Sequence, residues 1–181
     1  MIKVEDIQRI IIEDKCSDKK KMARKGQEYY DGDHDIKDYR LFYYTDDGIL
    51  IEDRYRANYR IPHPFFAELV DQAVQYMLSG GEFIKSDFPE LQKELDSYFN
   101  YNEEFTAELS EVLTGCMTKG FEYMFAYKNA EDKTAFQCAD SLGVIEVRKN
   151  DTDSDTEYVI YIYTDRIEKG QKKINRIQVW D

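Results

Sequence analysis

The chain shows two kinds of hydrophobic periodicity, one before Gly120 and one after it. Before Gly120, apolar side chains recur at helical spacing, which predicts amphipathic helices. After it, short aromatic and β-branched runs alternate with polar turns, which predicts strands. We expect helices over residues 3–14, 18–30, 65–79, 88–99 and 103–119. We expect strands over residues 121–127, 134–139, 144–148, 157–163 and 174–180.

The helix over residues 65–79 has the clearest apolar stripe, and Gly80 and Gly81 end it. We expect the stripe to pack against the apolar face of the helix over 103–119, because neither helix is stable alone. If that site is enclosed, replacing Leu69 by alanine costs roughly 2–5 kcal/mol of unfolding free energy. The stripe consists of Phe65, Leu69, Val70, Ala73, Val74 and Met77.

The segment between the second and third helices contains a hairpin signal. Aromatic and β-branched runs flank Asp46-Asp47-Gly48, which favours a tight turn. Residues 58–64 are expected to be extended, because Pro62 and Pro64 disfavour helix in the residues before them.

Helices followed by an antiparallel sheet predict the α+β class. We expect one domain over residues 1–181. Its N-terminal helices and extended arm cover residues 1–62, its helical core 63–119 and its antiparallel sheet 120–181.

The charge of the chain is acidic and uneven. The net charge is -12, and residues 63–119 alone carry 11 Asp/Glu against 3 Lys/Arg. Such an acidic surface argues against tight nucleic-acid binding, which requires cations that displace counterions. One basic cluster is interpreted as a solvated helix face. It consists of Lys19, Lys20, Lys21, Arg24 and Lys25.

The cysteines and the apolar runs argue against a zinc-binding, secreted or membrane protein. Cys16, Cys116 and Cys138 are far apart and form no Cys-x-x-Cys pair, which suits a reducing compartment and argues against a zinc site. The N-terminus lacks the pattern of a signal peptide, and no apolar run approaches the ~18 residues of a membrane span. We therefore expect no membrane association.

The run from Asp31 to Ile36 is a candidate for metal chemistry. Asp31, Asp33 and Asp35 have the spacing of the ligands at positions 1, 3 and 5 of a calcium loop. That loop needs Gly at position 6 and Glu at position 12, where this chain has Ile36 and Phe42. A second run with the same spacing, Asp151, Asp153 and Asp155, has Thr156 and Ile162 in place of the needed Gly and Glu and is interpreted as a solvated loop. We therefore expect no metal site in either run.

A metal-dependent phosphohydrolase that uses His34 and Asp35 is a second hypothesis for the first run. Its weakness is that the only other histidine, His63, lies in a proline-flanked segment. Cys116 lies on an apolar helix face, where a buried, inert thiol is expected. The sequence contains no phosphate loop and no nucleophile motif, so we expect no enzyme and no cofactor.

Three motifs, in their order along the chain, resemble the portal proteins of tailed bacteriophages, in the type found in phages and prophages of Gram-positive bacteria. The first motif consists of Gly26, Tyr29, Tyr30, Gly32, His34, Asp35 and Ile36. The second consists of Asn58, Arg60, Ile61, Phe65, Phe66, Val70, Asp71, Gln72, Tyr76, Gly80 and Gly81. The third is Lys119-Gly120 before Phe121 and Tyr123.

The resemblance implies a structural role for these residues, in the outer wing of a head-tail connector ring. It implies partners: other copies of the chain, terminase, capsid proteins and head-tail adaptor proteins. DNA would pass through the ring during packaging and ejection without sequence-specific binding. The location would be the portal vertex of the virion, and the host cytoplasm during assembly.

Two further expectations concern the length of the chain and the alternative to a portal. Portal proteins of this kind continue into a stem, a clip and a crown, so we expect this chain to be a fragment or a truncated remnant. The alternative is an acidic, tyrosine-rich protein-binding module or inhibitor unrelated to portals.

Overall fold

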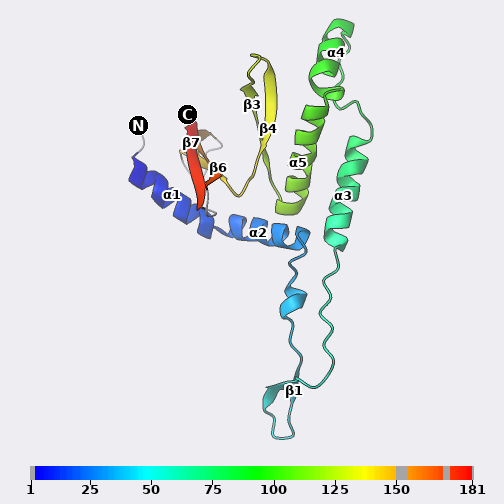
Figure 1. Cartoon of the computed structure of the whole chain (residues 1–181), viewed down its shortest axis with the longest axis vertical. Coiled ribbons are helices and arrows are strands. Elements are labelled where there is room, and N and C mark those ends of the chain that lie inside the picture. Colours follow the sequence, from blue (N-terminus) through cyan, green and yellow to red (C-terminus); the bar gives the residue numbers. More distant parts are fainter. Residues whose placement is uncertain (1–2, 150–154, 169–171, 181) are drawn as a thin grey trace.

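The computed structural model describes residues 3–149, 155–168 and 172–180, and it has the predicted α+β architecture. Two N-terminal helices run one after the other, and a long arm leaves the second of them before the chain returns to the central helices (Figure 1). Antiparallel sheets follow the last helix. Helices therefore precede strands along the chain, as the change of period at Gly120 predicts.

The N-terminal helices are α1, Val4–Cys16, and α2, Asp18–Tyr30. Ser17 separates them, and its hydroxyl oxygen accepts a hydrogen bond from the backbone N–H of Lys20 at 3.3 Å. This N-cap satisfies one of the backbone donors that the first turn of a helix leaves free. After α2 the chain turns at Gly32, whose φ of 78° lies in the left-handed region that favours glycine.

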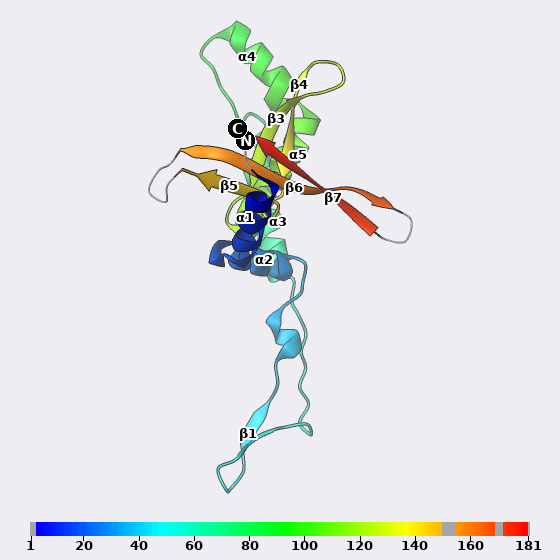
Figure 2. The same ribbon diagram turned by 90° about the vertical axis from the view of Figure 1, so that its left-hand side faces the viewer.

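The arm, which we define as residues 33–64, carries the predicted hairpin. It contains one 3-10 turn, η1 (Asp35–Asp38), and the strands β1 (Phe42–Tyr44) and β2 (Leu50–Glu52). The two strands pair antiparallel, with Tyr44 opposite Leu50. Figures 1 and 2 show the arm extending far from the rest of the molecule, with the hairpin at its tip.

The central helices agree closely with their predicted ranges. They are α3 (Phe65–Leu78), α4 (Pro89–Leu95), the π-helical turn η2 (Asp96–Asn100) and α5 (Glu103–Lys119). Asn102 caps α5, because its side-chain oxygen accepts hydrogen bonds from the N–H groups of Glu104 and Phe105 at 3.0 and 3.2 Å. Gly120, with φ 86°, ends α5 in the left-handed conformation.

The predicted burial of the α3 stripe is only partly correct. Val70 and Val74 are each 3% exposed on the side of α3 that lies against α5, but Leu69 is 64% and Phe65 60% exposed. The stripe is too wide for one neighbouring helix to cover, because residues 65 and 69 lie more than ~90° around the helix from residues 70 and 74. The prediction that α3 buries Leu69 is therefore wrong, and the cost that was conditional on enclosure does not apply.

The predicted strands all form, in two sheets rather than one. The first sheet pairs β3 (Tyr123–Lys128) with β4 (Thr134–Ala139). The second has the order β5-β6-β7, and all of its pairs are antiparallel. Its strands are Val144–Arg148, Thr156–Glu168 and Lys172–Trp180.

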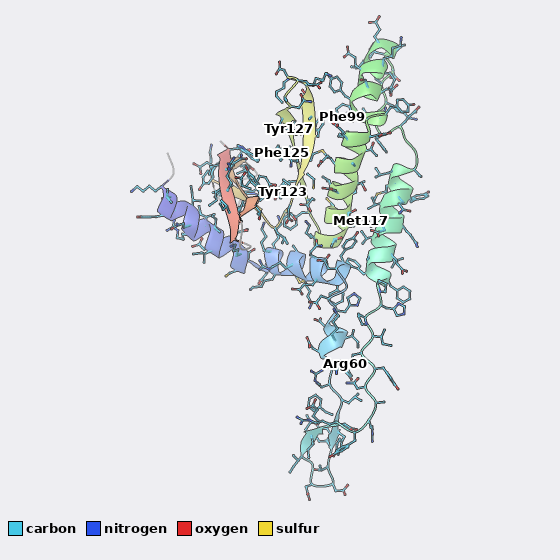
Figure 3. The ribbon with its side chains drawn as sticks, viewed as in Figure 1. Arg60, Phe99, Met117, Tyr123, Phe125 and Tyr127 are labelled. Carbon is cyan, nitrogen blue, oxygen red and sulfur yellow. The ribbon has the colours of Figure 1, made fainter. Side chains whose placement is uncertain are left out.

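Aromatic rings connect these elements. Phe99 of η2, Phe105 of α5 and Phe136 of β4 form one cluster, with ring centroids 4.9 to 5.4 Å apart. Phe125 of β3 contacts Trp180 of β7 at 5.4 Å, which joins the two sheets through side chains. Figure 3 shows Phe125 on the strand pair beside α5. Ring contacts of this kind contribute beyond the area that they bury.

Candidate functional site

The first and third motifs meet where α2 crosses the end of α5. Gly26 of α2 lies so close to Thr118 that a β-carbon at this position would be 3.1 Å from the Thr118 carbonyl carbon and nearer still to its oxygen. The same β-carbon would lie 3.8 Å from the α-carbon of Lys119. The backbones can therefore approach this closely only because residue 26 has no side chain.

The first and second motifs meet through a hydrogen bond between α2 and α3. The Tyr30 hydroxyl donates to a carboxylate oxygen of Asp71 at 2.7 Å, across 41 residues of sequence. This hydrogen bond, with a smaller contribution from burial, raises the pKa of Tyr30 to about 12. The tyrosine therefore stays protonated and remains a donor at any physiological pH.

The remainder of the first motif forms the base of the arm. The His34 ring stacks on Tyr29, with centroids 4.9 Å apart, and its Nε2 hydrogen-bonds to the Tyr29 carbonyl oxygen at 3.0 Å. Asp35 accepts a hydrogen bond from the Tyr29 hydroxyl at 2.9 Å and forms an ion pair with Lys25. The hydrogen bond from Lys25, followed by that from Tyr29, lowers the pKa of the Asp35 carboxyl.

The second motif supplies the return leg of the arm. The Asn58 side-chain amide donates to the Tyr39 carbonyl oxygen at 3.0 Å, and the Arg60 guanidinium donates to the Lys37 carbonyl oxygen at 2.9 Å. Figure 3 shows Arg60 between the two legs of the arm. Both side chains therefore satisfy backbone acceptors of the opposite leg and hold the legs together.

Other residues of the motifs lie apart from this junction. Phe66 is half-buried, in a hollow that Gly26, Tyr29 and Gly120 also line. The rest are on the surface or at the far end of α3, and the structure does not bring them to the same place. They are Ile36, Ile61, Phe65, Gln72, Tyr76, Gly80 and Gly81.

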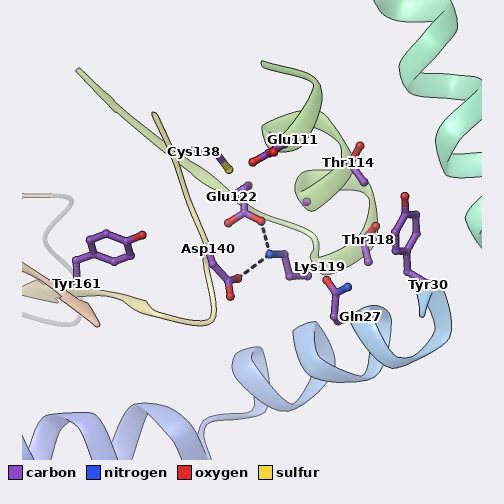
Figure 4. Close-up of a pocket in the computed structure, with 11 residues that line it drawn as sticks. Gln27, Tyr30, Glu111, Thr114, Thr118, Lys119, Glu122, Cys138, Asp140 and Tyr161 are labelled. Atoms are coloured by element: carbon purple, nitrogen blue, oxygen red, sulfur yellow. Dashed lines mark hydrogen bonds and ion pairs between the residues drawn. The ribbon is translucent and has the colours of Figure 1, made fainter. Parts of the chain in front are cut away.

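A hollow of about 460 Å³ lies beside the junction and contains an ion cluster. The Lys119 ammonium lies 2.7 Å from a carboxylate oxygen of Asp140 and forms a second ion pair with Glu122 (Figure 4). Burial opposes the charged form of Lys119, but the hydrogen bonds to Asp140 and Glu122 outweigh it and raise its pKa. Glu122 also accepts the backbone N–H of Ser141. The buried Lys119 ammonium is thus paired with two carboxylates and fixed in place.

Cys138 lies at the edge of this hollow. Burial, together with the nearby carboxylate of Glu122, raises the pKa of its thiol to about 12. Since the thiolate is the reactive form of cysteine, this environment suppresses nucleophilic chemistry. Cys116, on α5, is partly buried.

Sequence reasoning missed the role of Lys20. This residue was expected on a solvated helix face, but it is 3% exposed. Its ammonium donates to the carbonyl oxygens of Ser141 and of Val144, the latter at 2.7 Å, and lies 3.4 Å from Asp14. Burial lowers the pKa of Lys20, and Asp14 partly offsets this effect. The basic run gave no signal that one of its members points inward, because the partners are backbone oxygens more than a hundred residues away.

The two histidines do not share a site. His34 lies at the base of the arm, while His63 stacks on Phe65 with centroids 4.4 Å apart. Within residues 3–149, 155–168 and 172–180, no group of three or more His, Cys, Asp or Glu side chains is placed to hold a metal ion. Across those same ranges, no helix has both the length and the hydrophobicity to span a membrane.

Residues of all three motifs thus meet where α2, α3 and α5 come together, at the base of the arm. The chain belongs to the family of phage portal proteins of the SPP1 Gp6-like type, whose family model matches residues 11–181. It is therefore a structural component of a phage portal, as the three motifs predict. No curated protein matches the chain.

Proposed function

We propose that this chain forms the wing of a portal ring through which DNA is packaged and later ejected. The observation that carries the proposal is the family match, which covers residues 11–181. The partners would be further copies of the chain, terminase, capsid proteins and head-tail adaptor proteins. The chain would act at the portal vertex of the virion and would assemble in the host cytoplasm.

We further propose that the motif residues are structural and that the chain catalyses no reaction. Tyr30 hydrogen-bonds to Asp71, His34 to a backbone oxygen of α2 and Arg60 to a backbone oxygen of the arm, which supports a role in fixing the arm on the helices. The protonated Cys138 thiol and the ion-paired ammonium of Lys119 support the absence of catalysis. The comparisons do not support an unrelated binding module.

The acidity of the chain supports passage of DNA without sequence-specific binding. Its net charge is -12, so it offers few unpaired cations to phosphates. A polyanion can slide past such a surface, because few counterion-releasing contacts hold it in one register.

The proposal is tested in a phage whose genome carries this gene. Deleting the gene should leave heads that contain no DNA, and a tagged copy should label one vertex of each particle in electron micrographs. Filled heads without the gene, or label spread over the whole shell, would contradict a portal role. A matched strain with a silent change at the same locus controls for effects on neighbouring genes.

A further inference from the structure

The arm is exposed along its whole length. None of residues 33–64, all of which the structure describes, is buried. Eleven large apolar side chains of the arm are therefore exposed to solvent, among them Tyr55 and Tyr59 at 97% and 84%. The others are Ile36, Tyr39, Phe42, Tyr43, Tyr44, Ile49, Leu50, Ile51 and Ile61.

Such an arm lacks the contacts that would hold it in place by itself. Its hairpin has three residue pairs, Phe42–Glu52, Tyr43–Ile51 and Tyr44–Leu50. An isolated two-stranded hairpin is at best marginally stable in water, and contiguous exposed apolar surface marks an interaction site. The arm therefore requires a partner surface.

The body of the same chain does not supply that surface. Figures 1 and 2 show, in two perpendicular views, that the arm points away from every other element beyond its base. Each leg has about 12 residues, which reach up to ~40 Å when extended. The tip is thus presented to another molecule.

The chain carries a second uncovered apolar surface on α3 and α4. Phe65, Leu69 and Tyr76 lie within ~40° of one another around α3, and they are 60%, 64% and 83% exposed. Phe88, just before α4, and Leu91, within it, are also exposed, at 71% and 45%. We call these five side chains the α3–α4 face.

The tip of the arm and the α3–α4 face differ in net charge. Residues 40–60 carry four Arg and four Asp/Glu and so have no net charge, and those four are among the nine arginines of the chain. Residues 63–119, which include the α3–α4 face, have a net charge of -8, and α3 itself contains no Lys or Arg. Among the surfaces of a second copy, residues 40–60 therefore approach the acidic helices with little repulsion. The exposed Arg54 and Arg56 side chains, which pair with Glu52 and Asp53 within the arm, can gain further carboxylate partners there.

The area of the arm suits such a contact. At ~200 Å² for a fully exposed aromatic side chain, the six aromatic residues of the arm expose roughly 800 Å² in all. One partner in a standard-sized interface contributes about 800 Å².

We propose that the arm of one copy docks on the α3–α4 face of a second copy. Each copy carries both surfaces once, so the contact is heterologous and can be repeated from subunit to subunit. The inference rests on the proposed portal function, because it names the surfaces through which neighbouring wings would join.

Photo-crosslinking of the full chain tests the contact. A benzophenone amino acid replaces Tyr55, and this chain is mixed at high concentration with unmodified chain labelled with 15N. We expect crosslinked peptides in which residue 55 of one copy joins residues 65–91 of the labelled copy. Benzophenone at Tyr127, which is 43% exposed on β3, is the control and should give no such peptide.

Two surface variants make the test specific. Leu69→Glu on the labelled copy, or Arg54→Glu with Arg56→Glu on the benzophenone copy, should lower the crosslink yield by about tenfold, the change that 1.4 kcal/mol produces. Ile177→Glu, a change at a 47% exposed position on β7, should leave the yield unchanged. Circular dichroism confirms that each variant is folded.

The outcomes also separate this inference from the portal role. Crosslinks that fall elsewhere on the second copy, or no crosslinks at the highest soluble concentration, would overturn the docking of the arm on α3 and α4. Crosslinks in assembling phage that join the arm only to coat protein would assign the arm to the shell and overturn it as well. Labelling of a single virion vertex would still establish the portal role in each of these cases.

Discussion

Adding a single methyl group at Gly26 should lower the free energy of unfolding of the chain. The crossing of α2 and α5 leaves no room there, because an added β-carbon would meet the backbone of Thr118 and Lys119. A flexible side chain could rotate away, but a carbonyl group at the end of a helix cannot. In Gly26→Ala, α2 and α5 must therefore separate.

Two opposing terms set the magnitude. Replacing glycine by alanine inside a helix gains about 1 kcal/mol from helix propensity. Inserting a methyl group into a packed contact costs about 1–3 kcal/mol, and the upper end applies where the neighbour is backbone. We expect a net loss of about 1–2 kcal/mol, or roughly 2–8 °C in Tm for a chain of this size.

Urea unfolding followed by circular dichroism measures this loss. Gly80→Ala is the matched control, because Gly80 has no atom near the β-carbon position and no positive φ. The control should stay within about 0.5 kcal/mol of the parent chain. If Gly26→Ala is as stable as the control or more stable, α2 and α5 do not cross as closely as described.

Three further predictions follow from burial and from chemistry. Val74→Ala should cost about 2 kcal/mol in urea unfolding, whereas Leu69→Ala should cost less than about 0.5 kcal/mol, and equal costs would contradict the arrangement of α3. Iodoacetamide should modify the exposed Cys16 in the folded chain and leave Cys138 intact in peptide mass spectra, since the raised pKa keeps the Cys138 thiol protonated. The chain should retain no divalent metal after dialysis and hydrolyse no phosphoester; bound metal or activity that is lost in His34→Ala would refute this.

The local elements were predictable because their signals are local. Gly120 marks the C-terminal end of α5, and the predicted range of that helix matches the observed one. The hairpin at Asp46-Asp47-Gly48 follows in the same way from turn chemistry. Each signal lies within a few residues of the feature that it predicts.

What the sequence did not reveal depends on contacts between distant segments. The width of the α3 stripe could be read, but not which edge of it α5 would cover. The division of the strands into two sheets could not be read either, because it depends on β4 pairing with β3 and β5 pairing with β6 rather than with each other. Lys20 is the clearest case, because the two backbone oxygens that accept hydrogen bonds from it lie more than a hundred residues away and leave no side-chain pattern to detect.

The hydrogen bonds from Lys20 to two backbone carbonyl oxygens also constrain the order in which the chain folds during synthesis. The two carbonyl partners follow Lys20 by 121 and 124 residues. At ~5–20 residues per second, the ribosome needs about 6–25 s to supply them after Lys20 has been made. Throughout that interval the ammonium must remain hydrated, so α2 cannot settle into its final position. The N-terminal helices, although synthesised first, therefore reach their native state among the last elements of the chain.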